Sequence, residues 1–397
     1  MKITKIITKK YLIIYLTITI IISSLFINNL ASATVKVTDI EFIGAASLPT
    51  GFDFKNTELG GLSGITYDAK NDVYYAISDD RGYKAPARFY TLKIDISQGK
   101  LTKNSITPLA VTTLLNENNQ KFMPGKSDTE GIALTKNSTL FISSEGDIQK
   151  SINPFITEFA LASGKAINTL PIPNKFLPDS QKPQGIRNNL GFESLTISPN
   201  NQLLFTATEN ALIQDGAKAK PGSGSPCRIL QYNLAKNQPE KEFLYQTEPV
   251  TPLFNFTGRF DSGLPELIAL DNYGNLLSLE RSFTGLGFAI SLFQVSLENA
   301  DEIQNINSLA TADIQNIQPV TKNRLLDLQT LDVALDNIEG FTLGSKLPNG
   351  KTSLILVSDN NFNRLQSTQI LAFAIKVESP LTPLMRLLRL LRLSAPQ

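Results

Sequence analysis

Short apolar runs alternate with polar gaps along most of this chain, and one arrangement of them returns five times. Each copy has a small or acidic residue, an apolar run, a gap, a second apolar run and a carboxylate. The clear copies are DTEGIAL…LFISSEG (128–146), GFESLTIS…LLFTATE (191–209) and NIEGFTLG…LILVSDN (337–360). A weaker copy spans 264–282, and a first copy spans 61–82 with Ser63 in place of glutamate. Several strands per copy, at intervals of 63 to 73 residues, indicate a β-propeller rather than a solenoid.

Each repeat supplies up to four runs that are rich in Ile, Val, Tyr, Phe and Thr, the composition of strands. The expected strands of the first three repeats are 63–68, 73–78, 88–95, 106–114, 131–134, 140–144, 156–161, 166–172, 194–198, 203–208, 228–234 and 242–247. The fifth repeat ends with one at 369–377 and lacks a fourth, while an unpaired run at 35–45 precedes the first repeat. The sequence therefore predicts an all-β chain with a single five-bladed propeller, closed by its N-terminal strand. A sixth blade within 288–335 is the alternative.

The two ends of the chain differ from the repeats. Lys2, Lys5, Lys9 and Lys10 precede a long apolar run and the small residues Ala31-Ser32-Ala33, which predicts a signal peptide over 1–33 that is cleaved near Ala33. An uncleaved membrane anchor is the alternative. The propeller domain is expected over 34–380, in a secreted or periplasmic protein. The tail 381–397 carries Arg386, Arg389 and Arg392 among leucines, a pattern that suggests weak contact with a membrane surface.

Composition narrows the chemistry. Cleavage removes four lysines and no acid, which takes the formal net charge from +1 to −3 and leaves no basic field for nucleic acid. Cys227 is the single cysteine, so no intramolecular disulfide can form. The chain has no histidine, which excludes a Ser-His-Asp triad, histidine bases and histidine metal ligands.

Carboxylates recur at two places in the repeats, and propeller symmetry would bring them to one central channel. The first set precedes the first strand and comprises Glu130, Glu193, Glu266 and Glu339. The second set follows the second strand and comprises Asp79, Asp80, Glu145, Glu209, Glu280 and Asp359. Such a cluster needs counter-charge, and oxygen-only ligands suit Ca²⁺ or Mg²⁺. We expect Ca²⁺ on Asp79, Asp80, Glu145, Glu209, Glu266, Glu339 and Asp359, with Glu130 and Glu193 as catalytic carboxylates. Alternatively, the first set only ties neighbouring blades together through backbone N–H groups.

Arginines near these carboxylates are candidates for holding an anionic ligand, because a planar guanidinium binds phosphate or carboxylate through two parallel hydrogen bonds. The expected ligand-binding residues are Arg81, Arg88, Arg281 and Arg364.

The ordered motifs GGLSGITYD, SDTEGIAL, LFISSEGD, NLGFESLTIS, LLFTATEN and LDNIEGFTLG resemble the phytase-like family of secreted bacterial proteins, described as "esterase-like activity of phytase". The resemblance covers about residues 36–377. It implies a β-propeller that hydrolyses phosphate or other esters, and it is similar to propeller phytases in which carboxylates hold Ca²⁺. We therefore expect a metal-dependent ester hydrolase acting on a small phosphate or carboxylate ester, with a phosphomonoester as the first substrate class. A non-catalytic propeller that binds an acidic ligand, a glycan or a protein is the alternative.

Overall fold

The computed structural model of the chain describes residues 35–179, 181, 183–250, 258, 260–285 and 287–378. The expected signal peptide and C-terminal tail lie outside the described residues, so both stay predictions. Val37–Lys376 forms one compact unit. A second unit comprises Met1–Lys36 and Val377–Gln397. The structure describes only residues 35–36 and 377–378 of it.

The compact unit contains five four-stranded antiparallel sheets, which form the five blades of a propeller. Blade 1 comprises β4 (Leu62–Asp68), β5 (Val73–Ser78), β6 (Arg88–Ile94) and β7 (Ile106–Thr113). Blade 2 comprises β8 (Thr129–Leu134), β9 (Thr139–Ser144), β10 (Phe155–Ala160) and β11 (Ala166–Thr169). Blade 3 comprises β12 (Phe192–Ile197), β13 (Leu203–Thr208), β14 (Pro226–Asn233) and β15 (Gln238–Gln246). The first strand of each blade lies innermost and contacts the first strands of the neighbouring blades.

Blade 4 comprises β16 (Asp261–Ala269), β17 (Asn275–Phe283), β18 (Phe288–Ser296) and β19 (Thr321–Asp327). The segment 288–335 therefore completes this blade and makes no sixth one. A short hairpin of β2 (Asp53–Phe54) and β3 (Thr57–Glu58) stands apart from the blades. The described helices are the single 3₁₀ turns η1 (Ile148–Lys150), η2 (Asn174–Phe176), η3 (Ile314–Asn316) and η4 (Leu328–Thr330). Within the described ranges, none is long or apolar enough to span a bilayer.

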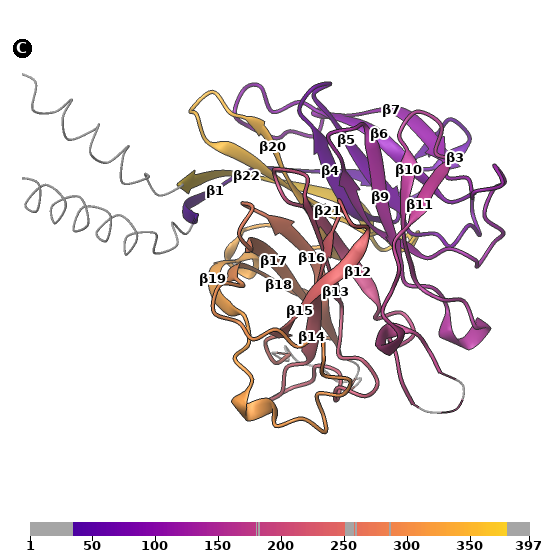
Figure 1. Cartoon of the computed structure of the whole chain (residues 1–397). Coiled ribbons are helices and arrows are strands. Elements are labelled where there is room, and N and C mark those ends of the chain that lie inside the picture. Colours follow the sequence, from indigo (N-terminus) through magenta and orange to yellow (C-terminus); the bar gives the residue numbers. More distant parts are fainter. Residues whose placement is uncertain are drawn as a thin grey trace, which may run out of the picture. The chain divides into compact units, whose positions relative to one another are not determined.

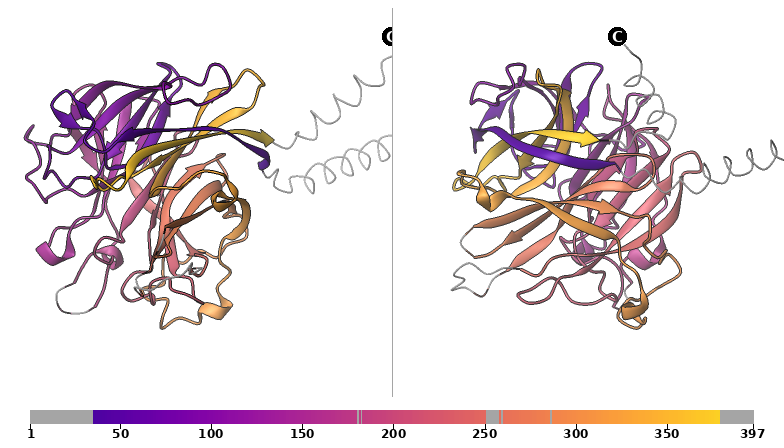
Figure 2. Two further views of the ribbon diagram at one scale, coloured as in Figure 1. Left: turned by 180° about the vertical axis from the view of Figure 1, so that it is seen from behind. Right: turned by 90° about the vertical axis from the view of Figure 1, so that its left-hand side faces the viewer.

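The N-terminal strand closes the ring, as the sequence predicts. Blade 5 comprises β20 (Ile338–Lys346), β21 (Thr352–Ser358), β22 (Ser367–Glu378) and, outermost, β1 (Lys36–Pro49). The indigo β1 lies beside the yellow β22 in all three ribbon views (Figures 1 and 2). Strand β1 also reaches blade 1, because Ile43 O accepts a hydrogen bond from Leu101 N at 3.0 Å. The first and last parts of the propeller are thus joined without a disulfide.

Alternating side chains build the core between neighbouring blades. On β5, Tyr74 and Ala76 pack in an apolar cluster with blade 5, whereas Tyr75 and Ile77 pack in another with blade 2. Further clusters join blade 2 to blade 3 and blade 3 to blade 4. Because each sheet is covered on both faces, its strands are apolar on both sides, which explains the near-continuous apolar runs in the sequence.

We expect the closing strand to be essential for stability. Deletion of residues 34–46 removes most of β1 and exposes the edge of β22, so the shortened chain should aggregate or unfold at a lower temperature. Differential scanning calorimetry with light scattering measures both effects, and a chain that lacks 381–397 is the control. Cooperative unfolding of the 34–46 deletion at the wild-type temperature would contradict this role of β1.

Candidate functional site

The backbone register shows which residues are equivalent in the five blades. The first and second strands of every blade share one register shift, which directly follows the pairs Leu62–Ser78, Thr129–Ser144, Phe192–Thr208, Gly263–Arg281 and Ile338–Ser358. We call the residue after the first member of each pair the first position, and the residue after the second member the second position. The first position holds Ser63, Glu130, Glu193, Leu264 and Glu339. The second position holds Asp79, Glu145, Glu209, Ser282 and Asp359.

Blade 4 therefore lacks a carboxylate at both positions, and its two glutamates are offset from them by two residues. Glu266 lies where blade 2 has Ile132, and its Oε1 accepts hydrogen bonds of 3.0 Å from the N–H groups of Leu195 and Leu267. Since Leu195 belongs to blade 3, Glu266 ties two blades together. Glu280 accepts hydrogen bonds from Tyr245 Oη and Lys322 Nζ at 2.7 and 2.6 Å. Both glutamates bond within the protein and lie outside the cavity described next.

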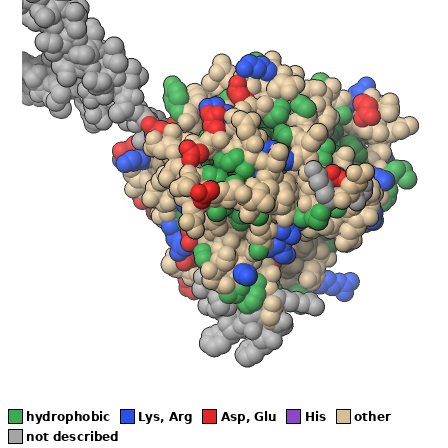
Figure 3. Space-filling view, turned by 60° about the horizontal axis from the view of Figure 1, so that its bottom comes forward, with side chains coloured by type: hydrophobic (Ala, Val, Ile, Leu, Met, Phe, Trp, Pro, Cys, Tyr) green, Lys and Arg blue, Asp and Glu red, His purple; other side chains and the backbone are tan. Residues whose placement is uncertain are grey.

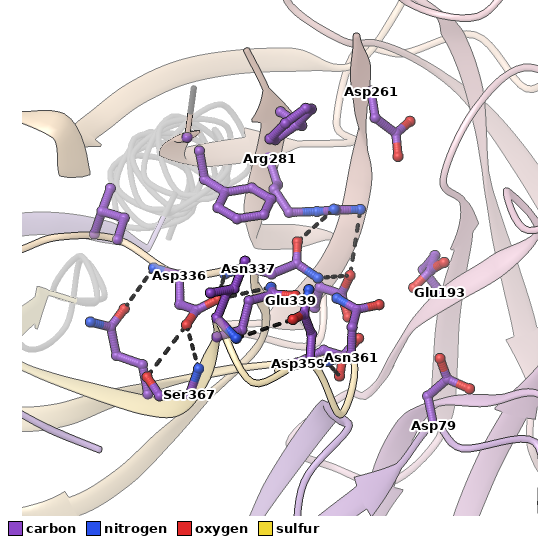
Figure 4. Close-up of a pocket in the computed structure, with 18 of the residues that line it drawn as sticks. Asp79, Glu193, Asp261, Arg281, Asp336, Asn337, Glu339, Asp359, Asn361 and Ser367 are labelled. Carbon is purple, nitrogen blue, oxygen red and sulfur yellow. Dashed lines mark hydrogen bonds and ion pairs between the residues drawn. The ribbon is translucent and has the colours of Figure 1, made fainter. Parts of the chain in front are cut away.

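A cavity of about 1020 Å³ opens over the inner strands. Of the expected site residues, it is lined by Asp79, Glu130, Glu193, Glu209, Arg281, Glu339 and Asp359. Figure 4 shows Asp79 and Glu193 on one side of the opening, across from Arg281. On the face shown in Figure 3, acidic and basic side chains are interspersed.

Five carboxylates from blades 1 to 3 form two triads that share Glu130. One oxygen each from Asp79, Asp128 and Glu130 lie within 4.8 Å of one another, and the same holds for Glu130, Glu145 and Glu193. The second-strand loops bring Asp79 and Glu145 to the axis, while Glu130 and Glu193 start inner strands. Such spacing allows three ligand atoms to contact one ion.

Each triad contains a carboxyl–carboxyl contact, Asp79 with Asp128 and Glu145 with Glu193. Ionised carboxylates have no hydrogen to donate, and the buried Asp79 Oδ1 and Glu145 Oε2 have no other hydrogen-bond partner. Each contact is therefore stable only with a shared proton or with a cation between the oxygens. These two oxygens are the strongest indication of a ligand in the described part of the chain.

Burial makes ionisation of the triads costly. It is the main cause that raises the pKa of Glu145 to about 8, and the Asp128 carboxylate adds to the shift. Burial and neighbouring carboxylates also raise the pKa of Asp79, Glu130 and Glu193 well above the usual range. A bound cation would reverse this effect, because it favours the ionised form.

The arginines are mostly engaged by carboxylates. Arg81 Nε donates to Asp128 Oδ1 at 2.7 Å. Arg281 Nη2 donates to Glu209 at 2.9 Å and Nη1 donates to Asn337 at 2.7 Å, which leaves its buried Nε without a partner.

Two other expected ligand residues lie elsewhere. Arg88 pairs with Asp80, and Asp80 also accepts hydrogen bonds from Gly82 N and Ala85 N, so this pair holds the β5–β6 loop. Arg364 is exposed and does not line the cavity.

Several residues of the site were not expected from the sequence, namely Asp128, Asp261, Asn337 and Asn361. Asp128 and Asn337 each stand two residues before a glutamate of the first set, in DTEG and NIEG. That shared spacing is the signal that identifies them. Asp261 and Asn361 occupy positions without such a pattern.

A family model described as "Phytase-like: Esterase-like activity of phytase" matches residues 57–362, most of the chain. The chain belongs to this phytase-like family. The membership confirms the resemblance found in the motifs and fits a hydrolase-like propeller. No curated protein matches the chain.

Several solved structures are similar to the chain at low sequence identity. An endo-arabinase from Bacteroides thetaiotaomicron is 13% identical, over 84% of this chain and 98% of that chain, with a TM-score of 0.42. The calcium-binding protein regucalcin from Agrobacterium tumefaciens is 10% identical, over 85% and 96%, with a TM-score of 0.42. A periplasmic gluconolactonase from Pseudomonas aeruginosa is 10% identical, over 86% and 100%, with a TM-score of 0.35. Similarities of this size carry no argument about the site.

The placement of Glu266 leads to a test of structural against functional glutamates. Replacement Glu266→Ala leaves two buried N–H groups without an acceptor and should lower the free energy of unfolding by about 1–3 kcal/mol. The loss should be equal with Ca²⁺ and with chelator, as measured by urea denaturation. The exposed Glu298→Ala is the control. A loss seen only with Ca²⁺ would mean that Glu266 acts on a cation.

The raised pKa of Glu145 predicts how stability depends on pH. The folded chain keeps a proton between pH 4.5 and about 8 that the unfolded chain has released. Without divalent cations, the free energy of unfolding should therefore fall as pH rises across this window, by about 1.4 kcal/mol per pH unit for one proton. Added Ca²⁺ should reduce the slope. Denaturant titrations from pH 5 to 8 measure it, and a flat profile in chelator would contradict the burial of ionisable carboxyls here.

Proposed function

We propose that this protein is a metal-dependent ester hydrolase whose cavity holds at least one hard divalent cation, Ca²⁺ in the first instance. The observation that carries the proposal is the pair of triads joined by Glu130, each with one unpartnered buried oxygen, on Asp79 and on Glu145. A purely structural cluster would be expected to satisfy these oxygens with N–H donors, as happens at Glu266.

The donor set fits such a cation. All five triad side chains offer oxygen, the ligand that Ca²⁺ and Mg²⁺ prefer, and the sequence has no histidine that would favour zinc. Asp79, Asp128 and Glu130 would hold one ion, and Glu130, Glu145 and Glu193 offer a second set. Glu145 is 2% exposed and Glu130 is 5% exposed, so few waters compete for these oxygens.

Different residues of the cavity then have different roles in hydrolysis. When bound, the cation neutralises oxygens of the ester and lowers the pKa of a water. Glu193, which lines the cavity, accepts the proton of the attacking water. Arg281 offers its free Nε–H to an oxygen of the ester group. Water adds to the carbon or phosphorus, the bond to the alcohol oxygen breaks, and the alcohol leaves with the proton that Glu193 returns to it.

Charge decides between the substrate classes. Arg81 and Arg281 are already paired with acids, whereas ten carboxylates lie in or beside the cavity. These carboxylates are Asp79, Asp128, Glu130, Glu145, Glu193, Glu209, Asp261, Asp336, Glu339 and Asp359. A phosphomonoester dianion would bind only after divalent cations have outweighed this charge, while an uncharged carboxylic ester needs less compensation. The same excess of acid weighs against the alternative, a metal-free propeller that binds an acidic ligand.

A secreted or periplasmic location is part of this proposal. Extracellular calcium modules commonly bind at 10⁻⁴–10⁻³ M, a range that a partly repulsive carboxylate cluster could serve. Weak membrane contact of the tail 381–397 stays a separate proposal, drawn from the sequence alone.

Metal binding and hydrolysis can be tested together. We expect isothermal titration to detect Ca²⁺ binding, a higher melting temperature with Ca²⁺, and hydrolysis of p-nitrophenyl phosphate or p-nitrophenyl acetate that chelator abolishes. Glu193→Gln removes one charge at constant shape and should lower kcat about 100-fold and weaken Ca²⁺ binding. Glu298→Gln, on an exposed site, is the control. Absence of Ca²⁺ and Mg²⁺ binding, with a chelator-insensitive melting temperature, would refute the metal mechanism.

A further inference from the structure

The cavity is not centred on the two triads. The triads come from blades 1 to 3, but most of the cavity lining comes from blades 4 and 5. We call this part the blade 4–5 groove. It runs from Arg281 past Phe283 and Phe288 to Leu335 and Leu365. A cation alone would need only the triads, so the groove leaves space for something larger.

One wall of the groove is apolar. Phe283 ends β17 and Phe288 starts β18, and their ring centroids lie 5.6 Å apart at an angle of 57°. Both rings are only partly buried, and they line the cavity. Leu365, further along, is 94% exposed. Apolar side chains that remain uncovered beside a polar site are typical of a ligand pocket.

The other wall presents amides and hydroxyls. Asn361, Asn363 and Gln366 from the β21–β22 loop line it, together with Ser367 at the start of β22. Asp336, beside these residues, is already satisfied, since it accepts hydrogen bonds from Gln366 Nε2 at 3.0 Å and from Ser367 N at 2.7 Å. The groove thus offers an apolar face and a polar face.

Arg281 separates the groove from the triads. It stands one residue before the second position of blade 4, which holds Ser282 where the other four blades have a carboxylate, and its unpartnered Nε is buried. An ester oxygen at this point would place the rest of the substrate over Phe283 and Phe288.

We propose that the blade 4–5 groove binds the organic part of the ester, and that this part is an uncharged planar ring. A flat ring can cover both phenylalanine side chains with one face while its substituents form hydrogen bonds with the amide wall. A short aliphatic group would leave the phenylalanine rings exposed to water. This inference rests on the proposed function for the reaction, but the binding of the ring itself does not require hydrolysis.

The test compares ring binding with hydrolysis. Fluorescence titration with 2-naphthol measures ring binding, in Ca²⁺ and in chelator, while 2-naphthyl acetate and ethyl acetate measure turnover. Replacement Phe288→Ala should weaken 2-naphthol binding and raise KM for the naphthyl ester by about tenfold, with little change for ethyl acetate. Tyr273→Ala removes an 81% exposed ring outside the cavity and should change nothing.

A second variant tests the groove even if Phe288→Ala does not fold. Leu365→Ser alters a fully exposed position, so it should fold normally and weaken 2-naphthol binding severalfold. If 2-naphthol does not bind the wild type, or binds both variants equally well, the groove assignment is overturned. If 2-naphthol binding depends on Phe288 but no ester is cleaved, the hydrolase proposal fails and the groove assignment stands.

Discussion

The close approach of the inner strands around the propeller axis is the constraint on which the site depends. A Cβ on Gly131 would lie 2.6 Å from Glu193 O, and one on Gly64 would lie 2.6 Å from Glu130 O. A Cβ on Gly340 would lie 2.7 Å from Ser63 O. Real Cβ contacts are longer, so glycine follows the first position in three blades. This backbone spacing is the physical origin of the Glu-Gly pairs in the repeat.

The same spacing forces carboxylates into one poorly hydrated volume. Because strands that touch at the backbone hold their preceding side chains close together, Glu130 meets acids from blades 1, 2 and 3. Burial then raises the pKa of each acid, and the cluster is stable only with protons or with a cation. The fold thus creates an unfavourable charge arrangement that a hard cation would relieve. The proposed cation site is therefore a direct consequence of how closely the inner strands pack.

The sequence could predict the blades and several residues that line the cavity because both follow from a repeat. Alternation locates the strands, and Glu130, Glu193 and Glu339 each start a copy whose second apolar run is followed by a carboxylate. It could not reveal the two-residue offset in blade 4, where Glu266 resembles the other glutamates but Leu264 occupies the first position. The pairing Gly263–Arg281 and the register shift after it determine this offset, and pairing between strands is a long-range property that a local pattern does not contain.

The offset in blade 4 also explains why the cavity extends to one side. A fifth carboxylate at the second position would complete a ring of like charge, which favours ions on the axis and leaves no direction for an organic ligand. Blade 4 has Ser282 at that position, and the preceding Arg281 binds Glu209 and Glu339 and lowers the repulsion on its side of the axis. With charge reduced there, phenylalanine and amide side chains can face the same space. The repeat supplies the carboxylates proposed as cation ligands. The blade that departs from the repeat makes the cavity one-sided and leaves space in it for a substrate.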